Sequence, residues 1–325
     1  MRRRSGLALL GLWAGAGSRA WAQPARVARV GWVGGQAGPN SLPTPTYLEA
    51  LRESLRDKGW VEGRNLQIEV RWGTRDMAAR LAGELVEQRI DVLVVQGTMV
   101  LGAKQVQAPP PIVFGFSGDP VEAGLVASFA RPGGRMTGVA MQSLQLVGKR
   151  MEILKEIQPS VRRIAILANP THPGEQLELR HSQDAASHLG LEVSYHPVTT
   201  EREFEAAFAA MQRSRPDAII AFPDATVIGQ AGAIAAFGAR QRIPAVSGWS
   251  EFVEAGNLMS YGPNLRAVWR QAADMVDRVL RGARPEDMPV EQPLRYELVL
   301  NLKVAQALGI TVPQAVLLRA DRLIE

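Results

Sequence analysis

Short apolar runs rich in β-branched residues alternate with amphipathic stretches along almost the whole chain after residue 27. This alternation predicts parallel β-strands joined by helical crossovers, with helices covering both faces of each sheet. Right-handed crossovers then produce doubly wound α/β sheets. Since 325 residues exceed the size of one ordinary domain, we expect two such parallel-sheet lobes.

The hydrophobic pattern also predicts where the individual elements lie. The expected strands are 27–33, 66–72, 91–95, 112–116, 137–141, 164–167, 191–195, 218–222, 244–247, 258–261 and 296–300. The expected helices are 45–58, 76–88, 99–106, 144–157, 174–189, 201–213, 226–241 and 264–281. The last helix has the clearest pattern, with an apolar residue every three or four positions from Leu265 to Val279.

Breaks rich in Gly or Pro interrupt this pattern at 131–134, near Gly256 and at 284–293. We interpret each break as a crossing between lobes, which predicts a multi-strand hinge that lets the lobes open and close. The expected N-terminal lobe comprises residues 23–135 plus 258–290. The expected C-terminal lobe comprises residues 136–257 plus 291–325, although the pattern alone leaves the lobe of 291–325 open.

Residues 1–22 have the pattern of a secretory signal peptide. Residues 2–4 are all Arg, an apolar run covers 7–17, and residues 20–22 read Ala-Trp-Ala, with small residues where a signal peptidase cleaves. The apolar run is shorter than the roughly 20 residues that span a bilayer. We therefore expect a soluble periplasmic protein, exported by the general secretory or the twin-arginine route. An uncleaved N-terminal anchor is the alternative.

Composition excludes several classes of protein. The chain has no cysteine, which excludes disulfides, thiolate metal sites, a cysteine nucleophile and a lipoprotein anchor. The formal net charge is +5, and cleavage after Ala22 would remove four arginines and no acid. A chain so close to neutral has no bulk attraction to nucleic acid or to an anionic membrane, so we expect neither as a partner.

No motif gathers the residue types that catalysis or a cofactor needs. The four histidines (His172, His181, His188 and His196) lack the spacing of metal ligands, and we expect them to face solvent. No G-x-S-x-G motif is present, and the glycines at 31–38 depart from the dinucleotide fingerprint. We expect no catalytic residue, no metal and no cofactor. An exported α/β enzyme acting on a small polar substrate is the alternative, which turnover of a bound ligand would identify.

The loops after the strands carry the candidate binding residues. In open parallel sheets, ligands bind beyond the carboxyl ends of the strands. The loops at these positions offer small residues, hydroxyls, amides and isolated acids, and the candidates are Gln36, Gln96, Gly97, Thr98, Ser117, Asp119, Asn169, His172, Asp224 and Trp249. Thr98, Asn169 and Asp224 equally suit helix N-caps, and Trp249 equally suits the seam between the lobes.

Longer segments around these loops resemble one known family. They are Gly59–Asn65, Ile112–Phe114, Gly118–Val121, Gly124–Ser128, Arg131–Gly134, Thr137–Val139, Ile164–Pro170, Leu258–Gly262 and Tyr296–Leu302. Together they resemble the ABC transporter substrate-binding proteins of the tryptophan/tyrosine type, over essentially the whole chain after the leader. The resemblance implies the type I-like architecture of periplasmic binding proteins. It also implies a solute that is captured between the lobes and handed to permease subunits in the inner membrane.

The resemblance implies an amino acid, or a related zwitterion, as the ligand of a receptor that we expect to be monomeric. We expect Asp119 to hold the ligand amine, and Thr98 with the amides after Asn169 to hold the carboxylate. Gln96 and Ala225 differ from the residues that many relatives carry at these positions. The preference for an aromatic side chain is therefore left open.

Overall fold

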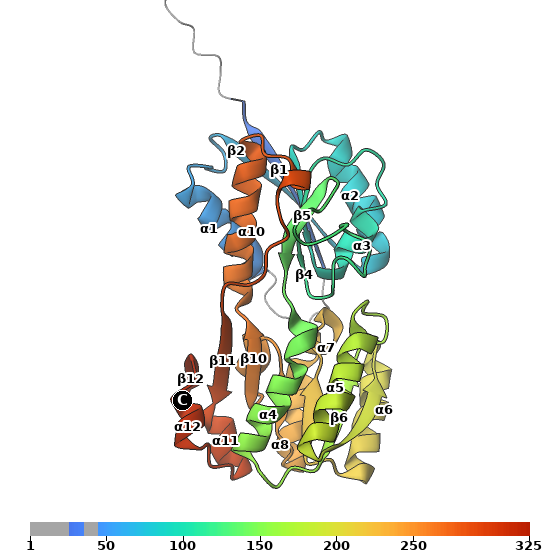
Figure 1. Ribbon diagram of the computed structural model, residues 1–325, viewed down its shortest axis with the longest axis vertical. Coiled ribbons are helices and arrows are strands. Elements are labelled where there is room, and N and C mark those ends of the chain that lie inside the picture. The colour runs from blue at the N-terminus through green and yellow to red at the C-terminus, as the bar shows by residue number, and fades with distance from the viewer. Residues whose placement is uncertain (1–25, 36–44) are drawn as a thin grey trace, which may run out of the picture.

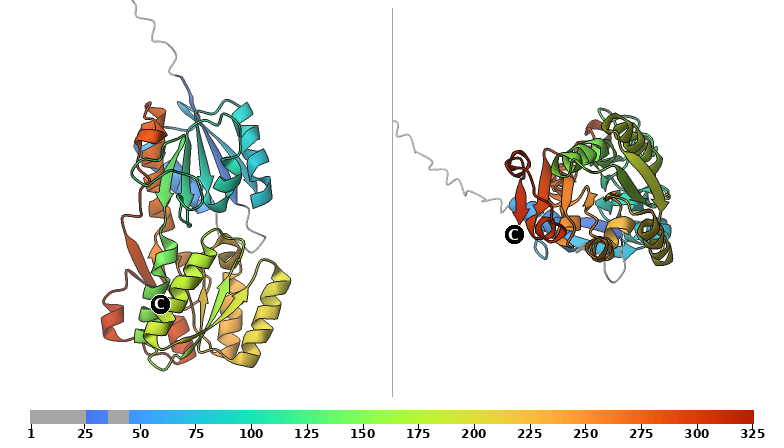
Figure 2. Two further views of the ribbon diagram at one scale, coloured as in Figure 1. Left: turned by 45° about the vertical axis from the view of Figure 1, so that its right-hand side comes forward. Right: turned by 90° about the horizontal axis from the view of Figure 1, so that it is seen from below.

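The computed structural model describes residues 26–35 and 45–325. The predicted signal peptide and the candidate Gln36 lie outside the described residues. Two α/β lobes lie end to end along the longest axis of the molecule (Figure 1). In the side view of Figure 2, helices cover both faces of each sheet. The predicted class, two doubly wound parallel-sheet lobes, is confirmed.

The first lobe contains five parallel strands in the order β2-β1-β3-β4-β5. They are β1 (Ala28–Gly35), β2 (Leu66–Gly73), β3 (Val92–Gln96), β4 (Ile112–Phe116) and β5 (Met136–Ala140). Helices α1 (Pro45–Asp57) and α10 (Leu265–Leu280) pack together on one face, and α2 (Ala78–Glu87) and α3 (Val100–Ala103) cover the other. Two short 3₁₀ helices, η1 (Arg75–Met77) and η2 (Gly97–Met99), follow β2 and β3.

The second lobe contains seven strands in the order β12-β11-β10-β9-β8-β6-β7. They are β6 (Arg163–Ala168), β7 (Glu192–Pro197), β8 (Ala218–Ala221), β9 (Ala245–Ser247), β10 (Met259–Pro263), β11 (Tyr296–Asn301) and β12 (Arg322–Ile324). The helices are α4 (Val147–Ile157), α5 (Glu175–Leu189), α6 (Glu201–Ser214), α7 (Ala225–Gly229), α8 (Ala231–Gln241), α9 (Ser250–Glu254), α11 (Leu302–Leu308) and α12 (Gln314–Leu317). Helices α4 and α5 pack on one face, and α6 and α8 on the other.

The chain passes between the lobes after β5, after β10 and before β11, in agreement with the multi-strand hinge that the breaks predict. Two boundaries differ from the expected ones. Strand β5, expected in the C-terminal lobe, pairs with β4 in the first sheet, and β10, expected in the N-terminal lobe, pairs with β9 in the second. The reason is that each Gly-rich break lies before the last strand of a lobe, whereas the crossing follows that strand.

The second sheet also departs from the all-parallel expectation. Strand β11 runs antiparallel to β10, because β10 leads out of the second lobe and β11 leads back into it. The short elements α11, α12 and β12 at the C-terminal end were not predicted. No helix in the described part of the chain is both long and apolar enough to span a bilayer.

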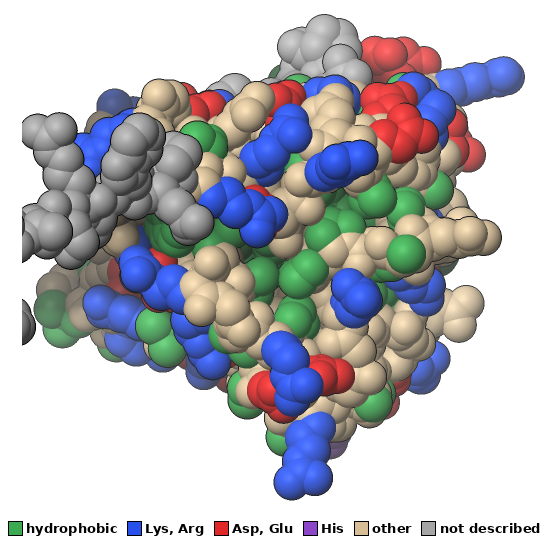
Figure 3. Space-filling view, turned by 90° about the horizontal axis from the view of Figure 1, so that it is seen from above, with side chains coloured by type: hydrophobic (Ala, Val, Ile, Leu, Met, Phe, Trp, Pro, Cys, Tyr) green, Lys and Arg blue, Asp and Glu red, His purple; other side chains and the backbone are tan. Residues whose placement is uncertain are grey.

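Charges of both signs occur on the end of the first lobe that faces away from the second lobe. Figure 3 shows Lys and Arg side chains on this face separated by apolar and neutral side chains, with Asp and Glu side chains toward its margins. Arginines of this lobe form ion pairs, among them Arg26, which precedes β1, with Asp91, and Arg284, which follows α10, with Asp287. Exposed pairs of this kind contribute little stability individually.

Candidate functional site between the lobes

The loops that carry the candidate residues meet where the two lobes face each other. The strand order reverses between β1 and β3 in the first sheet and between β6 and β8 in the second. The carboxyl ends of both sheets are directed toward the other lobe (Figures 1 and 2). Ligands of doubly wound sheets bind at such reversal points. The topology therefore brings the two predicted sets of loops together.

Ser117 and His172 join the lobes directly. Ser117, after β4, places its Oγ 2.8 Å from Nε2 of His172, after β6. Nδ1 of His172 accepts a hydrogen bond from the N–H of Gly174 at 3.2 Å, so the ring proton is on Nε2 and is donated to Ser117. Both side chains are buried, with exposed fractions of 5% for Ser117 and 8% for His172. His172 therefore does not face solvent, and that expectation is wrong.

The surroundings of His172 favour the neutral imidazole. Burial lowers the pKa of His172, the negative charge of Asp224 opposes this shift, and the positive charge of Arg75 adds to it. The ring of Phe116 is stacked against the imidazole, with the centroids 6.4 Å apart. An imidazolium would lose the hydrogen bond that Nδ1 accepts from Gly174. The contact between the lobes therefore depends on an unprotonated Nδ1.

Two further hydrogen bonds connect the lobes. The hydroxyl of Tyr47, in α1, donates to Oε1 of Glu251, in α9, at 2.7 Å, and Arg75 donates to the carbonyl oxygen of Thr171 at 2.6 Å. Burial raises the pKa of Glu251, and the hydrogen bond from Tyr47 opposes this rise. Burial and the neighbouring Glu251 raise the pKa of Tyr47, so the phenol keeps the proton that it donates. The candidate residues did not include Tyr47, Arg75 or Glu251.

Asn169 and Asp224 lie together at the reversal point of the second sheet. Nδ2 of Asn169 donates to Oδ1 of Asp224 at 3.1 Å. The same oxygen of Asp224 accepts from the N–H groups of Thr226 and Val227, and thereby caps α7. Asp224 is thus a helix N-cap, which was the alternative interpretation. Both side chains are buried.

The amides after Asn169 are already used within their own loop. The N–H of Thr171 donates to Oδ1 of Asn169, and the N–H of His172 donates to the Asn169 carbonyl. The N–H of Gly174 donates to the His172 ring. These amides were expected to hold a carboxylate, but an additional strong bond would require the loop to reorganise. We therefore do not retain them as carboxylate ligands.

The remaining candidates line the facing ends of β3, β4 and β9. Gly97 has φ +57°, a backbone conformation that favours glycine, and it is the first residue of η2. Thr98, the second residue of η2, is half-buried. Thr98 is therefore inside a 3₁₀ helix and is not an N-cap. Oδ1 of Asp119 accepts from the N–H groups of Val121 and Glu122, at 2.7 and 3.1 Å.

Two of the candidate residues each carry a buried polar atom that lacks a hydrogen-bond partner among the described residues. These atoms are Oε1 of Gln96, at the end of β3, and Nε1 of Trp249, after β9. The first is an acceptor and the second is a donor, and they come from different lobes. An unsatisfied buried polar atom costs about 1–3 kcal/mol, so both atoms favour an occupant that can bond to them. In residues 26–35 and 45–325, no three His, Asp or Glu side chains are grouped to hold a metal ion.

A two-lobed α/β fold with polar loops facing each other across the lobes has the arrangement of a protein that binds a ligand between its lobes. The chain matches the family model of ABC transporter substrate-binding proteins over residues 46–324, and it belongs to this family. The proteins of the family are substrate-binding proteins and not enzymes, in agreement with the absence of a catalytic motif in the sequence.

Individual proteins of known sequence or structure are similar over most of the chain. A tyrosine-binding protein of Clostridioides difficile (strain R20291) is 24% identical over 259 residues, which cover 79% of this chain and 74% of that protein. A conserved domain protein of Vibrio cholerae is 27% identical, with a TM-score of 0.84, and the match covers 92% of this chain and 100% of that one. An ABC domain from Streptococcus pneumonia in complex with L-Trp is 24% identical, with a TM-score of 0.83 and coverage of 91% and 99%.

Proposed function

We propose that the protein is the solute receptor of an ABC importer and binds an amino acid between its lobes. Family membership supports the receptor role. The names of two similar proteins, one tyrosine-binding and one in complex with L-Trp, support an amino acid as the ligand. The predicted signal peptide supports a soluble protein in the periplasm. We further propose that the protein is monomeric and delivers the ligand to permease subunits in the inner membrane.

The pair of unsatisfied atoms on Gln96 and Trp249 carries the amino-acid assignment. The Gln96 carbonyl needs a donor such as an ammonium, and the Trp249 indole N–H needs an acceptor such as a carboxylate. A zwitterion supplies both groups in one small molecule. Because the two side chains belong to different lobes, a ligand that bonds to both stabilises the arrangement in which the lobes are together.

Asp119 is the acid that we propose to pair with the ligand ammonium. Its two backbone hydrogen bonds both use Oδ1, and the side chain follows β4, two residues after Ser117. An ammonium–carboxylate contact in a partly buried site is a charge-assisted hydrogen bond, which is stronger than a neutral one. We further propose that the Thr98 hydroxyl, in η2 directly after β3, bonds to the ligand.

A thermal-shift screen tests the proposed ligand class. Purified protein, refolded to remove any bound ligand, is screened against amino acids, small amides, aromatic acids and sugars. A ligand at 100 times its Kd adds about 2.7 kcal/mol to the folded state, which raises Tm by a few degrees in a chain of this size. We expect shifts with α-amino acids, aromatic ones among them. Shifts confined to sugars, or none at all, would contradict the proposal.

Substitution of Asp119 tests the ammonium contact. Asp119→Asn keeps an oxygen for the N–H groups of Val121 and Glu122 and removes only the charge. We expect it to weaken binding of the amino acid by about ten-fold or more. Binding of an analogue that has the same side chain and carboxylate but lacks the amine is expected to stay unchanged. Asp119→Ala also removes the backbone contacts and serves as the comparison. Equal affinity of Asp119→Asn and the wild type would exclude this role.

A further inference from the structure

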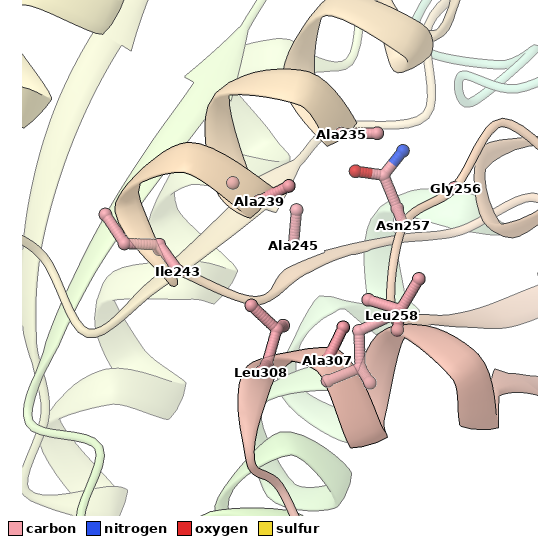
Figure 4. Close-up of a pocket in the computed structure, with 11 residues that line it drawn as sticks. Ala235, Ala239, Ile243, Ala245, Gly256, Asn257, Leu258, Ala307 and Leu308 are labelled. Atoms are coloured by element: carbon pink, nitrogen blue, oxygen red, sulfur yellow. The ribbon is translucent and has the colours of Figure 1, made fainter.

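A separate pocket lies on the flank of the second lobe. Helices α8 and α11 and the segment that leads into β10 enclose it (Figure 4). Its volume is about 420 Å³, which includes the part that is open to solvent. The side chains that matter for its chemistry are Ala235, Ala239, Ile243, Asn257, Leu258 and Leu308.

This pocket is distinct from the site between the lobes. Ala245 is the first residue of β9, and Leu258 immediately precedes β10, so the pocket lies at the amino ends of these strands. The residues that join the lobes follow the carboxyl ends of the strands. Trp249, for example, follows the other end of β9. A ligand in the pocket would therefore not compete directly with one between the lobes.

Asn257 provides the polar group of the pocket. Its side chain is only 2% exposed, and Nδ2 donates to the carbonyl oxygens of Ala231 and Phe252, both at 2.9 Å. These two bonds determine the orientation of the carboxamide, because the reverse orientation would place its oxygen against two other oxygens. Oδ1 then has no partner among the described residues.

The unpartnered oxygen is directed into the pocket. Figure 4 shows Oδ1 of Asn257 on the side of Ala239 and Ala245, whereas Nδ2 lies on the other side of the carboxamide. A buried carbonyl oxygen without a donor costs about 1–3 kcal/mol. An occupant with a hydroxyl or N–H group would recover this free energy.

The rest of the lining determines what kind of molecule fits. The other lining residues are Gly, Ala, Val, Ile and Leu, and none of the lining residues is charged. Burial of a charged group without a partner costs several kcal/mol, so this lining disfavours a zwitterion. The aliphatic walls favour a compact apolar body, which gains about 25 cal/mol for each Å² of apolar surface removed from water.

We propose that this pocket binds a small uncharged molecule with an apolar body and one hydroxyl or N–H group. The donor bonds to Oδ1 of Asn257, and the apolar body packs against Ile243, Val304 and Leu308. The site is separate from that of the amino acid, and its occupation does not depend on the function proposed above.

Phenol and toluene test this proposal, since they have nearly the same shape and only phenol has a donor. The purified protein is titrated with each compound and followed by amide NMR. We expect phenol to shift the resonances of α8, α11 and the Asn257 side chain, and to bind about ten-fold more tightly than toluene. Equal binding of the two compounds, no binding of phenol, or shifts confined to the loops between the lobes would overturn the proposal.

A variant that fills the pocket distinguishes phenol binding in the pocket from non-specific binding. Ala239→Leu adds a good helix-forming residue that occupies the pocket and leaves the hydrogen bonds of Asn257 in place. Ala236→Leu, at an exposed position on the same helix outside the lining, is the matched control. We expect the first variant to lose phenol binding and the second to keep it. Unchanged phenol binding by Ala239→Leu, or a water on Oδ1 of Asn257 that phenol does not displace in crystals, would exclude the site.

Discussion

Oγ of Ser117 and Nε2 of His172 lie 2.8 Å apart, across the boundary between the two lobes. The two residues follow β4 and β6, which belong to different sheets, so this hydrogen bond exists only while the lobes are together. The hydrogen bond between Tyr47 and Glu251 also joins the two lobes, so it too exists only while the lobes are together. Since a ligand between the lobes favours the closed arrangement, the strength of these bonds is expected to affect its affinity.

Ser117→Ala is expected to weaken the closed arrangement. The substitution removes the acceptor for the Nε2–H of His172 and leaves a buried donor unpaired, at a cost of about 1 kcal/mol. We expect about five-fold weaker ligand binding by calorimetry and a larger radius of gyration in solution scattering. Ser187→Ala, at an exposed position on α5, is the control. If both variants bind like the wild type, Ser117 does not stabilise closure.

Tyr47→Phe is expected to act through Glu251. The substitution removes the hydroxyl that donates to the buried carboxylate and leaves the aromatic ring in place. We expect a loss of ten-fold or more in ligand affinity, because hydrogen bonds to charged groups contribute about 1.5–3 kcal/mol and about 1.4 kcal/mol is a factor of ten. Glu251→Gln keeps an acceptor oxygen, so it is expected to lose less. A larger loss in Glu251→Gln than in Tyr47→Phe would contradict this account.

Ligand affinity is expected to fall as the pH falls below the ordinary pKa of histidine. The ordinary pKa of His172 is 6.5, and burial between the lobes lowers it. Below pH 6.5, His172 therefore binds a proton in the open form but not in the closed form. Further acidification favours the open form until the pH reaches the lowered pKa of His172 in the closed form. Stabilisation of the closed form is complete above pH 6.5 and is lost on acidification.

Calorimetry between pH 5 and 8 measures this dependence. His172→Gln is expected to weaken it, since the amide does not titrate. His196, whose pKa burial also lowers, lies on β7 at the edge of the second sheet, so His196→Gln is the matched control and is expected to keep the dependence. Equal pH profiles for wild type and His172→Gln would show that another group is responsible.

Arg150 connects two of the crossings between the lobes. Its fully buried guanidinium donates to Glu178 at 2.9 Å, to the carbonyl of Ser143 in the first crossing at 2.9 Å, and to the carbonyl of Tyr261 in β10 at 3.0 Å. Arg150→Met would leave the Glu178 carboxyl buried without its partner. We expect a loss of about 3–5 kcal/mol in the free energy of unfolding, measured by denaturant titration.

The double variant Arg150→Met/Glu178→Leu tests the origin of that loss. Replacing both partners by apolar residues removes the stranded carboxyl, so more than half of the lost stability should return. If the double variant is no more stable than Arg150→Met, the loss comes from the carbonyls of Ser143 and Tyr261 and not from the ion pair.

The sequence predicts most of the strands because each buried strand is a short apolar run. Strand β4 has the expected bounds, and all of its residues are buried. Strand β12 was not predicted, since it has three residues and is largely exposed at the sheet edge. Two boundaries of the lobes were displaced because the Gly-rich breaks mark turns before β5 and β10, whereas the chain crosses after these strands. The third crossing, before β11, follows the Pro-rich break at 284–293, as predicted.

The loops that meet between the lobes were predictable from the rule that functional loops of parallel sheets lie beyond the carboxyl ends of the strands. The same rule points to the loops after β2 and β9, which contain Arg75 and Glu251, although neither residue was among the candidates. Tyr47 has no such signal, because it lies in the first turn of α1 and meets Glu251 only through the packing of the two lobes. The sequence also does not show which backbone amides bond within their own loop, as those after Asn169 do, because this depends on the geometry of the loop.

Calorimetric titration of the refolded protein with an α-amino acid and its analogues tests the central claim most directly. The analogues of the best ligand lack either the amine or the carboxylate and keep the same side chain. The account predicts one ligand per chain and a loss of at least about ten-fold for each analogue, because each charged group has its own partner between the lobes. Equal binding of the amino acid and both analogues, or no binding of any amino acid, would contradict it.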